Sequence, residues 1–222
     1  MTLSNLKVGV PPYALTGTVY GTLNNDRALF ERLGDSVDKP PYKAAPKAPV
    51  LYVKPRNTLS VNGASMTMPG DVSELDIGAS VGLVIGRVAS RLKEDEALNY
   101  VSGVTLVADL RVPHESFYRP SVRFIARDGS CFVGPEVVGL KDGPSPDDIE
   151  LTVYVDGKEQ EAVRPDRLRS AAKLLADVTD FMTLVPGDVL LLGIPATMPR
   201  VRAGQTFAIA GTGIGRLEGA VV

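Results

Sequence analysis

Short apolar runs separated by turn residues recur along most of this chain. They are rich in Val and Ile, and they lie at Val50–Val53, Val81–Ile85, Val104–Ala108, Val122–Ala126, Leu151–Val155, Val189–Leu192, Phe207–Ala210 and Gly219–Val222. Runs of this length and composition predict strands. Asp156-Gly157 stands between two alternating segments, which predicts a type I′ hairpin at that point.

Helical patterns are fewer than strand patterns. A short helix is predicted between the capping residue Asp26 and Gly34, and further helices are predicted at Glu94–Tyr100 and Asp166–Leu184. Because the strands outnumber the helices and do not alternate with them, a doubly wound parallel sheet is disfavoured. The pattern therefore predicts an α+β fold that is predominantly β.

The chain is expected to have two parts. Residues 1–47 form an irregular N-terminal segment with a short helix, and residues 48–222 form the main domain. The connector 38–49 is rich in proline, which favours extended backbone, and its lysines are expected to be solvated. The 22 Gly and 17 Pro of the whole chain agree with a turn-rich fold.

Composition excludes several classes of protein. A single Cys allows no internal disulfide, and a single His with a single Cys excludes the common zinc clusters. A net charge of -2 without basic runs argues against binding to nucleic acid. No apolar stretch is long enough for a membrane span or a secretory signal, so we expect a cytoplasmic protein that does not bind membranes. Cys131 has no neighbouring base and is expected to be a buried structural thiol.

Two glycine-rich segments imitate known motifs. Gly78–Gly82 matches the nucleophile elbow of serine hydrolases, but it runs directly into strand-like residues. Gly211–Gly215 resembles a phosphate-binding loop, but no helix follows it. We therefore discount the serine hydrolase and interpret the second segment as a turn.

Several segments carry a resemblance when they are taken in order. They are Lys54–Thr58, Leu83–Arg87, Tyr100–Gly103, Val185–Leu190, Gly193–Pro195, Ala203–Gln205 and Gly213–Leu217. This ordered set resembles the fumarylacetoacetate hydrolase family. Pro11–Gly21, Ser116–Pro120 and Arg127–Gly129 resemble the N-terminal half of one branch, which decarboxylates and isomerises intermediates of homoprotocatechuate (4-hydroxyphenylacetate) catabolism. This chain has the length of one half.

The resemblance implies a mixed β-sandwich roll with few helices. It also implies Mg²⁺ or Mn²⁺ held by a Glu-x-Glu pair and a later Asp, because oxygen ligands suit hard cations. The metal would chelate a 2-oxo acid and stabilise an enolate. The implied substrates are a tricarboxylate and a dicarboxylate: 5-oxopent-3-ene-1,2,5-tricarboxylate, which is decarboxylated, and 2-hydroxyhepta-2,4-diene-1,7-dioate, which is isomerised.

The sequence departs from the family pattern at the metal positions. Aligned on Val84–Gly86, the two glutamates fall at Gly78 and Ser80, and only Asp109 keeps its carboxylate. One carboxylate alone makes a weak Mg²⁺ site. The cofactor, Mg²⁺ or Mn²⁺, thus stays an expectation from the resemblance alone.

Further departures concern the neighbouring family positions. Glu74-Leu75-Asp76 offers another acid-x-acid pair, but only in a shifted register. Of the family's His/Glu pair for water activation, Glu31 remains and Ala28 stands in place of the histidine. Ile125 stands where a substrate lysine is expected, and Ile194 stands in place of a threonine. Losing the histidine argues against hydrolysis but not against decarboxylation.

The candidate site residues match or flank these family segments. The catalytic candidates are Glu31, Asp109, His114 and Glu115, the substrate-binding candidates are Lys54, Arg56, Arg111, Arg119 and Gly193, and the metal candidate is Asp109. Arginine can grip a carboxylate in a bidentate manner, although each cation could instead pair with a surface acid. His114 and Glu115 could form an acid–base couple, or His114 could be an ordinary loop histidine.

Two functions stay open at this point. The first is a decarboxylase, with isomerase activity, of homoprotocatechuate catabolism. The second is a non-catalytic structural partner of a metal-competent homologue. A homodimer or a hetero-oligomer with a homologous subunit fits either function.

Overall fold

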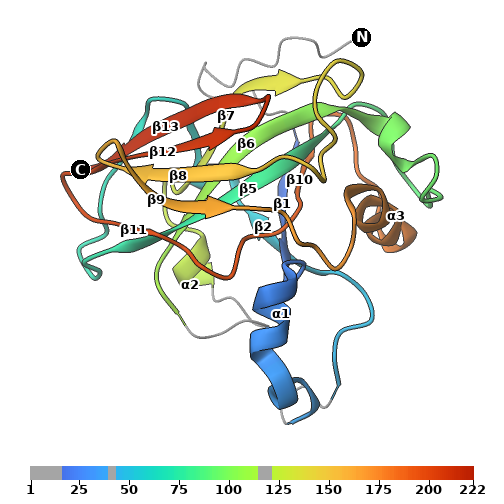
Figure 1. The fold of residues 1–222 in the computed structure, drawn as a ribbon, viewed down its shortest axis with the longest axis horizontal. Coiled ribbons are helices and arrows are strands. Elements are labelled where there is room, and N and C mark those ends of the chain that lie inside the picture. Colours follow the sequence, from blue (N-terminus) through green and yellow to red (C-terminus); the bar gives the residue numbers. More distant parts are fainter. Residues whose placement is uncertain (1–16, 40–43, 115–121) are drawn as a thin grey trace.

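Two mixed β-sheets make up most of the structure (Figure 1). The computed structural model describes residues 17–39, 44–114 and 122–222. In spatial order the larger sheet contains β2 (Val50–Lys54), β1 (Val19–Leu23), β10 (Val189–Leu191), β5 (Leu75–Ile85), β6 (Val101–Arg111), β7 (Cys131–Val138) and β3 (Leu59–Val61), and β11 (Arg200–Val201) pairs with β5. The smaller sheet contains β4 (Ser65–Met66), β13 (Gly215–Val221), β12 (Thr206–Gly211), β8 (Leu151–Val155) and β9 (Lys158–Val163).

Helices are short and lie at the margins of the sheets. The α-helices of the described residues are α1 (Arg27–Leu33), α2 (Val122–Ile125) and α3 (Ala171–Phe181). The 3₁₀ turns are η1 (Gly34–Asp38), η2 (Arg56–Thr58) and η3 (Ala97–Tyr100). None of the helices in the described part of the chain is long and apolar enough to cross a membrane.

The main core lies between the two sheets. All 11 residues of β5 are buried, because this strand runs between β10 and β6 in the larger sheet. Leu106 of β6 belongs to the same buried cluster as Val153 and Ile209 of the smaller sheet. Phe132 and Phe207 meet edge to face within it, with ring centroids 5.0 Å apart. The burial of these facing apolar side chains holds the sandwich together.

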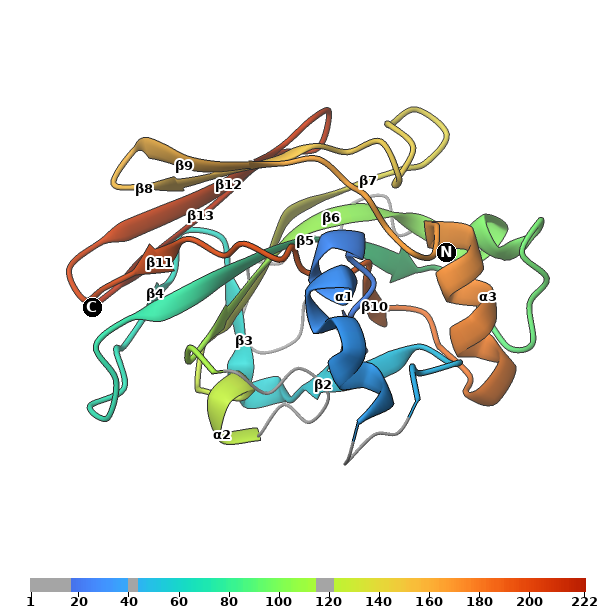
Figure 2. The same cartoon turned by 60° about the horizontal axis from the view of Figure 1, so that its bottom comes forward.

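The opposite face of the larger sheet has a core of its own. Val84, Val107, Val133 and Val189 form a second buried cluster there. Figure 2 shows β2 and β3 beneath β5 and β6, on the side away from β8, β9, β12 and β13. The larger sheet therefore curls, and strands that are not neighbours in it can face one another across the curl.

Two local predictions are confirmed in detail. The carboxylate of Asp26 accepts a hydrogen bond from the backbone N–H of Leu29 at 2.8 Å, which caps the N-terminus of α1. Asp156 and Gly157 join β8 to β9 with φ angles of 49° and 74°, the positive values that a type I′ turn requires at both central positions.

Both glycine-rich segments have the structures expected of them. Gly78–Gly82 lies inside β5, so no strand-to-helix elbow lifts Ser80. Gly211–Gly215 forms the turn between β12 and β13. The mixed β-sandwich roll with few helices is also confirmed.

Two strand assignments are wrong. Val122–Ala126, expected as a strand, begins with the single helical turn of α2, in which the N–H of Ala126 donates to the carbonyl of Val122. Val122 is 70% exposed whereas Ile125 is buried, so only one side of this short helical turn packs inward. Val19–Leu23, expected to be part of the irregular segment, forms β1 in the larger sheet. The division of the chain after residue 47 stays a prediction.

The two later helices are shorter than predicted. α3 begins at Ala171 rather than near Asp166, because Arg167 forms a β-bridge with Asp26 and Ser170 then caps the helix through its hydroxyl. The segment Glu94–Tyr100 contains only the turn η3. In each case tertiary hydrogen bonds or a cap override the apolar spacing.

The packing of β13 on the core predicts a specific cost at Gly219. A Cβ atom there would lie 2.4 Å from Phe207 Cζ and 2.8 Å from Phe132 Cε1. We expect Gly219→Ala to lower the free energy of unfolding by about 1–3 kcal/mol through overpacking. Gly70→Ala, whose Cβ meets nothing within 4 Å, is the matched control in urea denaturation. Equal stability of the two variants would contradict the packing described here.

Candidate functional site

A fully buried ion pair joins β2 to β6 across the curl of the larger sheet. Lys54 Nζ lies 2.7 Å from Asp109 Oδ1, and both side chains are 0% exposed. The same ammonium donates to the carbonyl oxygen of Ile125 and to Ser130 Oγ, the latter at 3.2 Å. An ammonium has three N–H donors, so each of them has an oxygen acceptor. Lys54 thereby ties β2 to β6, to the end of α2 and to the start of β7.

Tyr52 and Arg111 complete the cluster. Each lies two residues from a member of the ion pair on the same strand, and alternate residues of a strand share a face. The Tyr52 hydroxyl donates to Asp109 Oδ2 at 2.6 Å and accepts from Arg111 Nη2 at 2.7 Å. Arg111 Nη2 also pairs with Asp109 Oδ2. We call Tyr52, Lys54, Asp109 and Arg111 the buried ion cluster.

Gly21 makes room for the tyrosine of this cluster. It pairs with Tyr52 in the register of β1 and β2. A Cβ atom at Gly21 would lie 1.9 to 2.4 Å from three atoms of the Tyr52 ring. Only glycine therefore lets the ring lie flat over β1 and reach Asp109.

The cluster fixes the ionisation of its members. Burial raises the pKa of Asp109, but the charges of Arg111 and Lys54 and the hydrogen bonds it accepts lower it further, to about 2. Burial raises the pKa of Tyr52 well above its ordinary value, so its hydroxyl keeps its proton. Burial also raises the pKa of the neighbouring Cys131 to about 12, which agrees with an unreactive structural thiol.

The predicted site residues are only partly brought together. Lys54, Asp109 and Arg111 lie in the buried ion cluster. Glu31 and Arg56 are exposed, and neither shares a hydrogen bond with the cluster within the described residues. Glu115 and Arg119 lie outside the described residues.

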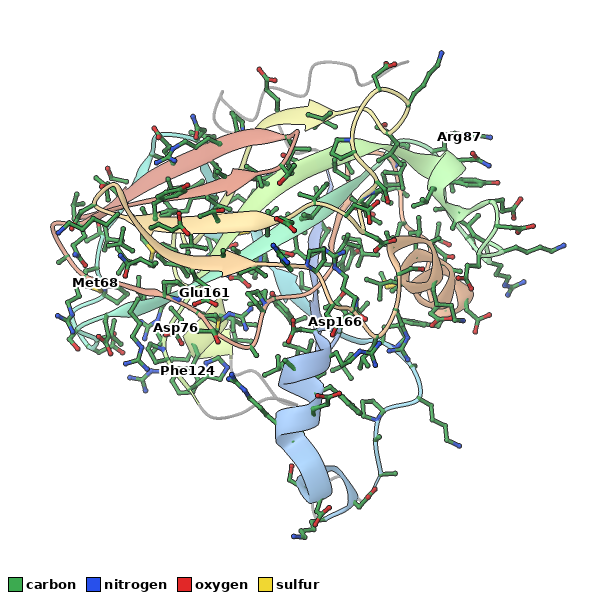
Figure 3. All side chains as sticks on the ribbon, viewed as in Figure 1. Met68, Asp76, Arg87, Phe124, Glu161 and Asp166 are labelled. Atoms are coloured by element: carbon green, nitrogen blue, oxygen red, sulfur yellow. The ribbon has the colours of Figure 1, made fainter. Side chains whose placement is uncertain are left out.

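His114 and Gly193 contact residues other than the four members of the cluster. His114 Nδ1 is 2.8 Å from the carbonyl oxygen of Val112, and its ring stacks on Phe124 with centroids 5.3 Å apart. Asp76 and Phe124 are labelled in Figure 3; burial raises the pKa of Asp76, and the charges of Arg200, Arg111 and His114 partly offset this rise. Gly193 has a φ of 120°, and its carbonyl oxygen accepts from Ser80 Oγ at 2.7 Å.

Sequence reasoning missed Tyr52 and Ser130. A partial signal for Tyr52 was present, because Val50–Val53 was predicted as a strand, and a strand that continues by one residue puts Tyr52 on the same face as Lys54. No comparable signal exists for Ser130, which directly precedes β7 and is 76 residues from Lys54 in the sequence. Both residues supply oxygen atoms to the cluster.

Comparison with known proteins identifies the chain's relatives. The family profile "Fumarylacetoacetate (FAA) hydrolase C-terminal" matches residues 18–222. The chain belongs to the fumarylacetoacetate hydrolase family. It is 36% identical over 209 residues to a "4-hydroxyphenylacetate degradation bifunctional isomerase/decarboxylase" of Salmonella dublin, covering 94% of this chain and 48% of that protein. The chain thus spans about half the length of such relatives.

Solved structures of this family have the same fold. A 5-carboxymethyl-2-hydroxymuconate delta-isomerase from Mycobacterium smegmatis is 27% identical with a TM-score of 0.76, covering 94% of this chain and 79% of that one. A fumarylpyruvate hydrolase from Pseudomonas aeruginosa, solved with Mn²⁺ and pyruvate, has a TM-score of 0.77 over 92% of this chain and 89% of that one. At 21% identity this second likeness shows the fold alone.

The family metal does not fit the side chains of this site. Gly78 pairs directly with Asp109 between β5 and β6, so the register places the expected ligand positions side by side. Gly78 has no side chain, and the Ser80 hydroxyl already donates to the carbonyl of Gly193. Of the three expected ligand positions only Asp109 has a carboxylate, and both of its oxygens accept hydrogen bonds from the cluster. Hard cations such as Mg²⁺ and Mn²⁺ need more oxygen ligands than this.

The shifted acid pair does not supply the missing ligands. Asp76 pairs with Arg200 at 3.1 Å, and Glu74 pairs with both Arg200 and Arg202. Within residues 17–39, 44–114 and 122–222, no three His, Cys, Asp or Glu side chains gather closely enough to hold a metal ion. The carboxylates of Glu74 and Asp76 are thus neutralised by arginines at and beside β11.

The departures from the family pattern lie together in space. Ile125 and Ile194, which stand where a lysine and a threonine were expected, pack with Tyr52 in one small buried cluster. Ile194 also lies against Gly78, where a Cβ atom would be 2.9 Å from Ile194 Cδ1. Apolar side chains therefore fill the space beside Asp109.

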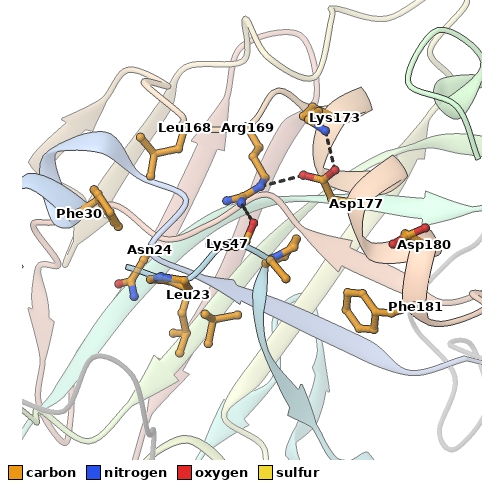
Figure 4. Close-up of a pocket in the computed structure, with 14 residues that line it drawn as sticks. Leu23, Asn24, Phe30, Lys47, Leu168, Arg169, Lys173, Asp177, Asp180 and Phe181 are labelled. Carbon is orange, nitrogen blue, oxygen red and sulfur yellow. Dashed lines mark hydrogen bonds and ion pairs between the residues drawn. The ribbon is translucent and has the colours of Figure 1, made fainter. Parts of the chain in front are cut away.

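A separate pocket of about 590 Å³ lies between β2, α1 and α3 (Figure 4). Its charged groups are largely paired with one another: Asp177 binds both Arg169 and Lys173, and Arg169 donates to the carbonyl of Lys47. None of the predicted site residues lines it. The pocket is therefore distinct from the buried ion cluster.

Removing the carboxylate of the cluster is expected to be costly. Asp109→Asn leaves Lys54 and Arg111 buried without a countercharge, and breaking a buried pair in this way costs about 3–5 kcal/mol. Asp95→Asn, at an exposed position, is the control. Urea denaturation of both variants measures the difference. A loss below about 1 kcal/mol in Asp109→Asn would contradict the burial and pairing described here.

The lowered pKa of Asp109 predicts a pH dependence with a definite sign. A carboxyl whose pKa is about 2 in the folded state and 3.8 in the unfolded state stabilises the fold above pH 3.8, and this contribution is lost as the pH falls toward 2. The denaturation midpoint of the wild type should therefore fall more steeply across this interval than that of Asp109→Asn. Parallel plots of denaturation midpoint against pH for the two proteins would show that Asp109 does not contribute to the pH dependence of stability.

Proposed function

We propose that this chain is an N-terminal-type unit of an isomerase/decarboxylase in homoprotocatechuate (4-hydroxyphenylacetate) catabolism. The proposal is supported by the 36% identity to a bifunctional isomerase/decarboxylase over nearly the whole chain. The assembly's reactions are the decarboxylation of 5-oxopent-3-ene-1,2,5-tricarboxylate and the isomerisation of the resulting 2-hydroxyhepta-2,4-diene-1,7-dioate. The substrates are thus small di- and tricarboxylates.

The site's own geometry favours the role of a non-catalytic structural partner within that assembly. The observation that carries this role is the replacement of the two ligand glutamates by Gly78 and Ser80, beside an Asp109 already bound to Lys54 and Arg111. The carboxylates for a metal-dependent step would come from a homologous companion unit. This unit would then complete a hetero-oligomer with that companion, in keeping with its match to 48% of a bifunctional relative.

A second candidate is an independent lyase with isomerase activity, working as a homodimer. The favouring observation is that the related proteins are named as isomerases and decarboxylases. Arg111 would be its carboxylate-binding residue, because its Nε is buried and has no hydrogen-bond partner in the described part of the chain. A decarboxylation also needs no activated water, so the missing family histidine at Ala28 does not argue against it.

Reconstitution tests the two candidates together. Turnover of the tricarboxylate is followed by CO₂ release and by diene absorbance for this chain alone, for a homologous subunit that retains Glu-x-Glu, and for their mixture. We expect no turnover from this chain alone and a rate in the mixture above that of the companion alone.

Each contrary outcome has a distinct meaning. Turnover by this chain alone at the rate of the mixture would contradict the partner role and support the independent enzyme. A mixture no faster than the companion alone, with no complex on size-exclusion chromatography, would contradict the partner role altogether.

A further inference from the structure

We infer that the Lys54 ammonium is the resident cation of the buried site, and that it cross-links the surrounding strands in a unit that takes no divalent ion there. This inference concerns the site alone and does not depend on the pathway proposed above. It rests on three features: the oxygen atoms around Lys54, the occupancy of Asp109, and the space beside Gly78.

The first feature is the set of oxygen atoms around the ammonium. They belong to the Asp109 carboxylate, the Ile125 carbonyl and the Ser130 hydroxyl, and they come from three separate segments of the chain. Carboxylate, carbonyl and hydroxyl oxygens are also the atoms that would surround a hard metal ion. The Lys54 ammonium, which comes from β2, thus binds the kinds of oxygen atom that would otherwise bind a metal cation.

The second feature is that both oxygens of Asp109 accept hydrogen bonds from charged or hydroxyl donors. Its Oδ1 accepts from Lys54, and its Oδ2 accepts from Tyr52 and Arg111. A divalent ion would have to displace these donors while approaching two buried positive charges, which repel it. Asp76, opposite Arg111 in the register, is already engaged by Arg200. Asp109 is thereby kept from serving as a metal ligand.

The third feature is the lack of room for replacement ligands. A Cβ atom at Gly78 would lie 2.9 Å from the Asp109 carbonyl oxygen and 2.9 Å from Ile194 Cδ1. Ile194 is held in turn by Tyr52 and Ile125. The site is therefore packed as a core around the ammonium.

The experiment uses the isolated chain and Mn²⁺ as the probe. Thermal unfolding is measured in EDTA and in excess MnCl₂, and free Mn²⁺ is counted by its electron paramagnetic resonance signal. We expect the same Tm in both solutions and no loss of free Mn²⁺ signal. A Tm that rises with Mn²⁺ in the wild type but not in Asp109→Asn would overturn the inference, whatever the outcome of the turnover assays.

Variants test the positive role of Lys54. Lys54→Met leaves three buried oxygen atoms without their donor, and we expect Tm to fall by about 6–12 °C relative to the exposed control Lys93→Met. Ser130→Ala removes one acceptor and keeps the charge, so it should fold with a fall of about 2–4 °C. If Lys54→Met and Ser130→Ala had the same Tm as Lys93→Met, the inference would be overturned.

Discussion

The interaction between Asp109 and its two buried cations constrains much of this structure. A carboxylate at 0% exposure is tolerated only when charge and hydrogen bonds replace the water it has lost, and here Lys54, Arg111 and Tyr52 do so. Lys54 and Tyr52 come from β2, which is not adjacent to β6 in the sheet. The sheet must therefore curl for the cluster to form, and Gly21 must be small for Tyr52 to reach it.

The departures from the family pattern have a common physical meaning. Gly78, Ile125 and Ile194 each replace a polar side chain that the family resemblance leads one to expect, and in space they lie around the same carboxylate. In this chain apolar side chains surround an internal ion cluster. Such a site agrees with the proposed partner role, because the cluster links strands without an exchangeable ion.

The sequence was a good guide to local structure and a partial guide to the site. The cap at Asp26 and the hairpin at Asp156-Gly157 were predictable because each depends on neighbouring residues. α2 was not, because Val122 is exposed and its apolar run mimics a strand. The family resemblance assigned Gly78, Ser80 and Asp109 to one site, and the pairing of Gly78 with Asp109 between β5 and β6 agrees with that assignment. The contacts of Lys54 with Ser130 and Ile125 did not, because they depend on the curl of the sheet.

The central claim is that a lysine, and not a metal ion, neutralises Asp109. Crystals grown from or soaked in MnCl₂ and measured at the Mn absorption edge test this claim most directly. The account predicts no anomalous peak within bonding distance of Asp109, and Lys54 Nζ in contact with its carboxylate. An anomalous peak bound to the Asp109 carboxylate, with Lys54 displaced, would contradict it.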